Sequence, residues 1–172
     1  MSVESEFQTV SASHLLQSMD RIEACVTRLT PQQVWQRHSE NENAVGNLLL
    51  HLRGNVTQWI LSGVGGQADH RHRESEFNAR TGPGATRLLA DLRSTMDQAA
   101  QLIRELSAAR LLERISVQDY DVTVLGAIYH VVEHFSGHTF QIILLTKLFT
   151  GQDLGFYKHL DSHGSLPDPK LP

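Results

Sequence analysis

The sequence predicts an all-α protein built as an antiparallel four-helix bundle. Four long segments carry apolar residues at alternating spacings of three and four, which is the period of one helix face. No segment alternates apolar and polar residues over the length of a sheet-forming strand. At 172 residues and 40% hydrophobic content, the chain suits one domain with a single core, which we place at residues 1–172. Four helices around one core form the predicted bundle.

The first two predicted helices lie in the N-terminal part of the chain. Pro31 marks the end of the first. Its apolar residues are Leu15, Met19, Ile22, Val26 and Leu29. The second runs from about residue 43 to residue 62, and the glycines that begin at Gly63 end it. Its apolar face consists of Val45, Leu48, Leu49, Leu52, Val56, Trp59 and Ile60.

The other two predicted helices are the longest. The third runs from about residue 85 to residue 107, with an apolar seam of Leu88, Leu92, Ala99, Ile103 and Leu106. The fourth opens near Thr123 and continues to Thr150, with Gly151 beyond its end. Its inward residues are Ile128, Val132, Phe135, Ile142, Thr146 and Phe149.

The connections between these helices differ in length and composition. Residues 63–84 form a long loop of about 20 residues between helices two and three, longer than the usual helix connection. It is either a functional loop or contains a short helix. Residues 111–121 suit a turn or a short strand. From about residue 151 we expect an irregular tail, its first part held by Leu154, Phe156 and Tyr157.

Charge and cysteine content exclude several functional classes. With 15 basic and 19 acidic residues the net charge is −4, which argues against nucleic-acid binding. A single cysteine, Cys25, excludes an internal disulfide and a thiolate metal cluster, and we interpret it as a small buried residue. The acidic start lacks a signal sequence, and apolar runs fall short of the ~20 residues of a membrane span. We therefore expect a cytoplasmic protein without nucleic-acid or membrane partners.

Three histidines stand at successive four-residue spacings in the fourth predicted helix: His130, His134 and His138. Residues four apart are neighbours on a helix, so two of them can bind one ion. At about 100° per residue, His138 lies nearest the apolar face, His134 at its edge and His130 furthest towards solvent. His51, alone in an aliphatic stretch of the second helix, offers a third ligand. The competing interpretation is that these are ordinary hydrogen-bonded histidines beside the core.

We therefore predict a divalent-metal site formed by His51, His134 and His138. Three neutral histidines with open positions suit zinc or nickel, and an open position can hold water or a thiolate. Gln141 follows His138 by three residues and can orient its imidazole, and His130 is placed at the mouth of the pocket.

Further residues are candidates for substrate contact. Asn55 and Trp59 follow His51 by one and two helical turns on the same face and can form pocket walls, although Trp59 equally suits the core. Arg71 and Arg73 in the long loop can hold an anionic substrate group. The alternative for these arginines is an ion pair with Glu74 or Glu76.

Over nearly its whole length the chain resembles the DinB-like superfamily of metal-dependent enzymes. The resemblance rests on the start of the first helix, on Asn-Leu-Leu-Leu-His-Leu-Arg-Gly-Asn at 47–55, on Arg71-x-Arg73-x-x-Glu76-Phe77, and on His134-x-x-x-His138-x-x-Gln141-Ile142. The last motif commonly reads H-x-x-x-H-R-G-Q-I, and Thr139-Phe140 here replace its Arg-Gly pair, so no role for that arginine carries over. The resemblance implies a four-helix bundle whose zinc or nickel ligands match His51, His134 and His138.

What the resemblance implies about activity is a reaction class. Similar proteins include bacillithiol-dependent S-transferases and mycothiol-dependent isomerases, in which a metal activates a low-molecular-weight thiol. This predicts thiol transfer to a small electrophile. The alternatives are a metal-dependent hydrolase and a non-catalytic, stress-related metal-binding or interaction module. The family is often dimeric, and we expect a homodimer, with Leu50, Leu144 and Leu145 as candidate interface residues. The alternative is that these leucines pack under the loop or the tail.

Overall fold

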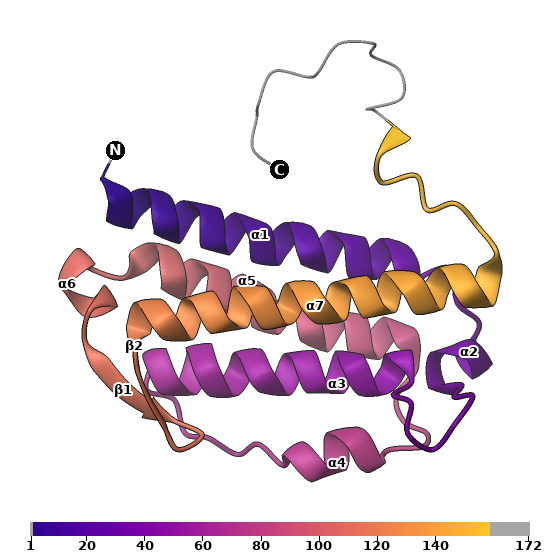
Figure 1. Ribbon diagram of the computed structural model, residues 1–172. Coiled ribbons are helices and arrows are strands. Elements are labelled where there is room, and N and C mark those ends of the chain that lie inside the picture. The colour runs from indigo at the N-terminus through magenta and orange to yellow at the C-terminus, as the bar shows by residue number, and fades with distance from the viewer. Residues whose placement is uncertain (1, 159–172) are drawn as a thin grey trace.

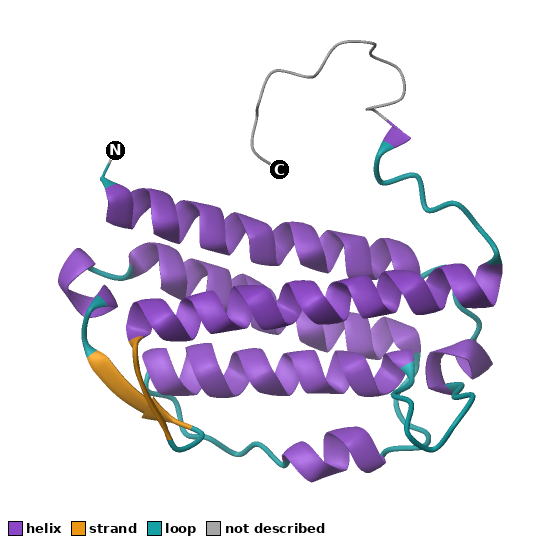
Figure 2. Cartoon of the chain, in the orientation of Figure 1, coloured by secondary structure: helices purple, strands orange, loops and turns teal. Residues whose placement is uncertain are grey.

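The computed structural model describes residues 2–158 and is predominantly helical, which confirms the predicted helical class (Figure 2). Four long helical segments lie side by side (Figure 1). They are α1 (Val3–Val26), α3 (Val45–Val56) with its continuation η1 (Thr57–Val64), α5 (Ala85–Glu105) and α7 (Val124–Thr150). α1 packs against α5 and α7, and α3 packs against the same two helices. The apolar faces of all four segments meet in one core.

The longest helix, α7, begins and ends where the sequence predicts. The Thr123 side chain accepts a hydrogen bond from the backbone N–H of Gly126 and so caps the first turn. At the other end Gly151 has a φ of 66°, the left-handed conformation that glycine adopts most readily after a helix. Its N–H donates to the carbonyl of Lys147. Local capping signals therefore fix the helix that carries three of the histidines.

The first helix ends earlier than predicted, because Pro31 begins a helix rather than ending one. α1 stops at Val26, and Leu29 lies in the following turn, where it is still buried. Pro31 occupies the first position of α2 (Pro31–Trp35), where its missing N–H is not needed. The Thr30 side chain caps this short helix by accepting from the backbone N–H of Gln33.

The second predicted helix continues as a π-helix, which the sequence did not indicate. α3 gives way at Thr57 to η1, so the wider turns carry Gln58 and Trp59. A π-helix changes the angular position of each following residue, and such segments are frequent at functional sites.

The connecting segments contain short elements of regular structure. The long loop holds α4 (Arg73–Asn78), so the short-helix alternative is the one observed. α6 (Ala108–Leu111), which the sequence did not predict, precedes the antiparallel hairpin of β1 (Arg114–Val117) and β2 (Tyr120–Thr123). The hairpin confirms the turn or strand expected there, and it lies at one end of the long helices (Figure 1).

The chain after α7 returns to the core before the described part ends. Leu154 is buried and Phe156 packs against the core, as predicted, whereas Tyr157 is exposed. The predicted tail from residue 159 onward lies outside the described residues. Among the described helices, none combines the length and apolar character needed to cross a membrane.

Candidate metal centre

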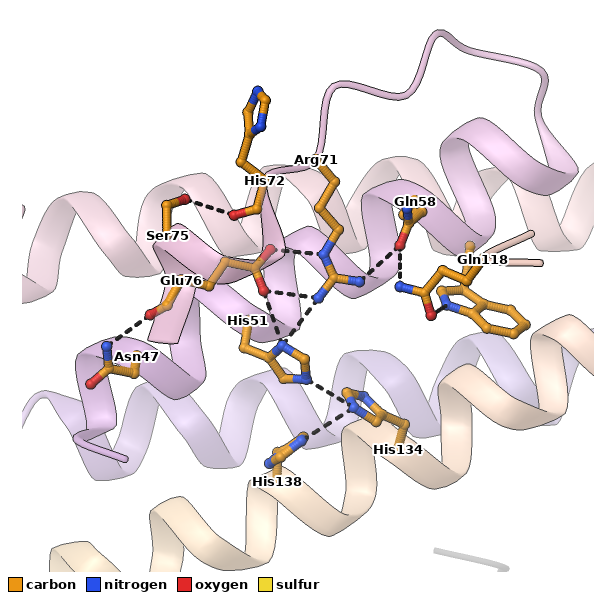
Figure 3. Close-up of polar contacts among 11 residues, drawn as sticks. Asn47, His51, Gln58, Arg71, His72, Ser75, Glu76, Gln118, His134 and His138 are labelled. Carbon is orange, nitrogen blue, oxygen red and sulfur yellow. Dashed lines mark hydrogen bonds and ion pairs between the residues drawn. The ribbon is translucent and has the colours of Figure 1, made fainter. Parts of the chain in front are cut away.

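Three histidine side chains from two helices converge on one point (Figure 3). The Nε2 atom of His134 lies 3.0 Å from Nε2 of His51 and 3.2 Å from Nε2 of His138. One nitrogen from each of the three rings lies within 4.8 Å of the other two. His51 is 4% exposed, and the two α7 histidines are half-buried. The structure thus brings together the three residues that the sequence singled out.

The spacing and charge of this cluster fit a divalent metal. Two nitrogens bound to one zinc ion at the tetrahedral angle lie about 3.3 Å apart, close to the observed separations. Burial lowers the pKa of His134 to about 3, and the neighbouring imidazoles act in the same direction. Burial also lowers the pKa of His138. Both rings are therefore neutral near pH 7, which is the form that binds metal. The three residues could therefore hold a metal ion.

His51 contacts a buried ion pair through Nδ1, on the side of its ring away from the other two histidines. The sequence did not assign this ion pair to the site. Arg71 donates from Nε and Nη2 to the two Glu76 carboxylate oxygens, each at 2.8 Å. Oε2 of Glu76 lies 3.0 Å from Nδ1 of His51. Because the carboxylate accepts the Nδ1–H, the lone pair of His51 is left on Nε2, which faces the other histidines.

Electrostatics keep the Glu76 carboxylate ionised. Burial raises its pKa, but the hydrogen bonds from Arg71 and His51 outweigh burial and hold the pKa below its ordinary value. Nη2 of Arg71 also lies 3.0 Å from Nδ1 of His51. The ionised carboxylate has no proton to donate, so its contact with His51 requires the proton on Nδ1, and Nδ1–H donates to Glu76. The group behind His51 is therefore a charged acceptor at neutral pH.

The close approach of α4 to α3 depends on two residues of α3. A Cβ atom on Gly54 would overlap the Glu76 carboxylate and lie 2.9 Å from Nε of Arg71. Asn47 donates from Nδ2 to the backbone carbonyls of Glu76 and Ala79, at 2.8 and 2.9 Å. The amide therefore holds the C-terminal part of α4 and the residue after it against α3, and the glycine leaves room for the Glu76 side chain.

The β-hairpin also reaches the centre through a chain of side-chain hydrogen bonds. Arg71 donates from Nη1 to Oε1 of Gln58 at 3.0 Å, and Gln118 of the hairpin turn donates to the same oxygen (Figure 3). Trp59 donates in turn from Nε1 to Oε1 of Gln118 at 3.3 Å. Gln58, Gln118 and Glu76 were not predicted as site residues. Only Glu76 carried a signal, as a candidate ion-pair partner within a motif of the long loop.

The remaining predicted residues divide into those that touch the cluster and those that do not. Oε1 of Gln141 lies 2.7 Å from Nδ1 of His138, as expected for a residue that orients this imidazole. The ring of His130 lies 5.6 Å from that of His134 and 4.1 Å from that of Trp59, measured between ring centroids. Trp59 is 3% exposed, so it belongs to the hydrophobic core and also contacts His130 beside the cluster.

The two arginines of the long loop differ in their contacts. Arg71 has a 3% exposed side chain whose donors are directed to Glu76 and Gln58, so the ion-pair alternative is the one observed. Arg73 is exposed, and its guanidinium carbon lies 4.8 Å from the centre of the Phe77 ring. Asn55 is buried one turn after His51.

We predict that Gly54→Ala destabilises both the fold and the centre. The added methyl group must displace Glu76 or Arg71, so the free energy of unfolding should fall by about 1–3 kcal/mol. Zinc affinity should fall as well, because His51 loses its acceptor. Urea unfolding and zinc titration measure the two effects. Gly137→Ala is the matched control, since nothing lies within 4 Å of the added Cβ atom. Alanine is more stable than glycine in a helix by about 0.5–1 kcal/mol, so this variant should not be destabilised. Equal zinc affinity in both variants would contradict the prediction.

We also predict that the metal-free protein loses stability as the pH falls below about 6.5. Between pH ~3 and ~6.5 the unfolded chain binds a proton at His134 that the folded chain excludes, so stability decreases as the pH drops through this window. Above its ordinary pKa of 4.5, Glu76 is ionised in both the folded and the unfolded chain and does not contribute to this change. Urea unfolding with a chelator present should show a smaller decrease for His134→Ala. An equal decrease in the variant would refute this explanation.

Comparison with known proteins supports the fold. A solved structure described as that of a conserved protein from Enterococcus faecalis aligns with a TM-score of 0.73 at 14% identity, covering 88% of this chain and 99% of that one. No curated protein matches the sequence. Residues 2–159 match the model of the family described as "Protein of unknown function (DUF1572)". Because this match spans nearly the whole sequence, the chain belongs to the DUF1572 family.

Proposed function

We propose that the protein is a metal-dependent enzyme with the antiparallel four-helix bundle of the DinB-like superfamily. We propose further that it transfers a low-molecular-weight thiol to a small electrophile. The observation that carries the proposal is the convergence of the Nε2 atoms of His51, His134 and His138. Glu76 and Gln141 support this by holding two of the rings from their Nδ1 sides.

The number of ligands favours chemistry over a structural role. Structural zinc sites are closed by four protein ligands, whereas catalytic sites keep a position open. Within the described residues the cluster has three members. A zinc or nickel ion held there would supply an open position that lowers the pKa of a bound thiol or water.

The residues around the cluster can keep it in one arrangement. Glu76 fixes the tautomer of His51, and the guanidinium of Arg71 keeps that carboxylate charged. Gln141 orients His138. The rings of Trp59 and His130 pack against each other at a tilt beside His134. These contacts hold the imidazoles in place before a ligand arrives, which lowers the cost of ordering them on binding.

The nucleophile in this proposal comes from outside the protein. Cys25, the single cysteine, is fully buried in the core, and burial raises the pKa of its thiol. A buried thiol with a raised pKa is a poor source of thiolate. An exogenous thiol is therefore the better candidate, and water at the same position is the hydrolase alternative.

The homodimer also stays a proposal. Of the three leucines predicted at its interface, Leu144 is 58% exposed and available for such a contact. Leu50 and Leu145 are partly buried and pack against the core, which fits the alternative interpretation for these two.

We predict about one divalent metal ion per chain, bound through the three clustered histidines. Elemental analysis of purified single variants should show that His51→Ala, His134→Ala and His138→Ala lose the metal. His130→Ala should keep it, because the His130 ring packs against Trp59 and is not one of the clustered ligands. Metal loss in His130→Ala together with retention in His134→Ala would show that the ligand set is wrong.

The thiol-transfer proposal predicts a specific dependence on cosubstrate. With a generic electrophile, the metal-loaded protein should require added thiol, lose activity on chelation and keep it in Cys25→Ser. A spectrophotometric assay of thiol consumption measures all three. Full-rate hydrolysis without thiol would move the assignment to a metal-dependent hydrolase. No turnover with either nucleophile would favour the non-catalytic binding module.

A further inference from the structure

We propose that Asn55 positions the metal centre by accepting a hydrogen bond from Nδ1–H of His134 when a metal is bound. The inference rests on the proposed metal site and adds a residue whose part there is to hold a ligand. It follows from two buried polar atoms that lack partners and from the register of α3 against α7.

Two of the three clustered histidines have a hydrogen-bond acceptor at the ring nitrogen that faces away from the cluster. All three meet through Nε2, so each Nδ1 points away from the shared centre. Two of these outer nitrogens have an acceptor, Oε2 of Glu76 at 3.0 Å for His51 and Oε1 of Gln141 at 2.7 Å for His138. Metal-binding histidines almost always donate their second ring N–H in this way, which fixes the tautomer and the ring orientation.

The exception is Nδ1 of His134, which is buried and has no hydrogen-bond partner among the described residues. If His134 binds metal through Nε2, its Nδ1 carries the proton and needs an acceptor. A buried donor left without a partner is unfavourable, because it gives up its hydrogen bonds to water without replacement. His134, whose Nε2 contacts both other rings, is thus the one histidine of the three whose Nδ1 has no acceptor among the described residues.

A matching acceptor lies on α3. Asn55 is 4% exposed, and its Oδ1 is buried without a hydrogen-bond donor among the described residues. One unpartnered acceptor and one unpartnered donor therefore stand on two helices that pack against each other. Buried polar atoms in native structures are rarely left unpaired, so each of them requires an explanation.

The register of the two helices places these atoms opposite each other. The His51 ring lies 4.9 and 5.0 Å from the rings of His134 and His138, and the Trp59 ring lies 4.1 Å from that of His130. The two segments therefore run antiparallel. His51 lies between His134 and His138, and Trp59 lies beside His130, so Asn55, midway between His51 and Trp59, lies opposite the stretch from His130 to His134. This places Asn55 beside His134, and the proposed hydrogen bond forms on rotation about its soft χ2 torsion.

The test compares two variants of Asn55 in the full chain. Asn55→Leu removes the acceptor at similar volume and should lower zinc affinity about 10–100-fold, measured by competition with a chromogenic chelator. Asn55→Asp retains an acceptor and should bind zinc at least as tightly as the wild type. Gln8→Leu is the control, because it removes another buried amide, which donates to Ile103 and Leu106 carbonyls away from the centre. It should leave zinc affinity unchanged.

A second measurement needs no variant to fold. In nitrogen-15 spectra of the zinc-loaded wild type, Nδ1–H of His134 should give a signal protected from solvent exchange. Absence of that signal, unchanged zinc affinity in Asn55→Leu, or an equal loss in Asn55→Asp would overturn the role of Asn55 while leaving the metal site intact. Failure of the wild-type protein to bind zinc or nickel would overturn the proposed metal function and this inference together.

Discussion

The buried ion pair between Arg71 and Glu76 is the interaction on which the centre depends. The two side chains are 3% and 9% exposed, and removing such charges from water costs free energy that their mutual attraction does not always offset. The pair is better explained by what the carboxylate does, since it accepts from His51 and selects the ring nitrogen that faces the other histidines. Through this pair the long loop becomes part of the site.

The sequence predicted those parts of the structure that depend on residues close together in the chain. Apolar spacing and caps at Thr123 and Gly151 define α7, and the four-residue spacing places His134 beside His138. His51 was found because a lone histidine in an aliphatic stretch is conspicuous. By contrast, Glu76 reaches His51 across 25 residues of sequence, and only the missing side chain of Gly54 makes room for it. No local pattern records such a contact.

Two local errors have equally physical causes. A proline can follow the end of one helix or occupy the first turn of the next. Pro31 is in the first turn of α2, because the Thr30 side chain caps that helix. The π-helix at Thr57–Val64 was missed because eight residues are too few for apolar spacing to distinguish a wider turn from an α-helix. This matters for the site, since the wider turns carry Gln58 and Trp59 towards the hairpin.

The hairpin turn stores conformational strain. Gln118 and Asp119 have φ values of 50° and 63°, a left-handed pair that glycine and asparagine normally supply. Such residues cost on the order of 1 kcal/mol each and persist only where tertiary contacts enforce them. Here Gln118 bridges Trp59 and Gln58, so its side chain offsets the unfavourable backbone. The two-residue turn between the paired Val117 and Tyr120 requires this backbone, so loss of the Gln118 contacts would leave its cost uncompensated and weaken the hairpin.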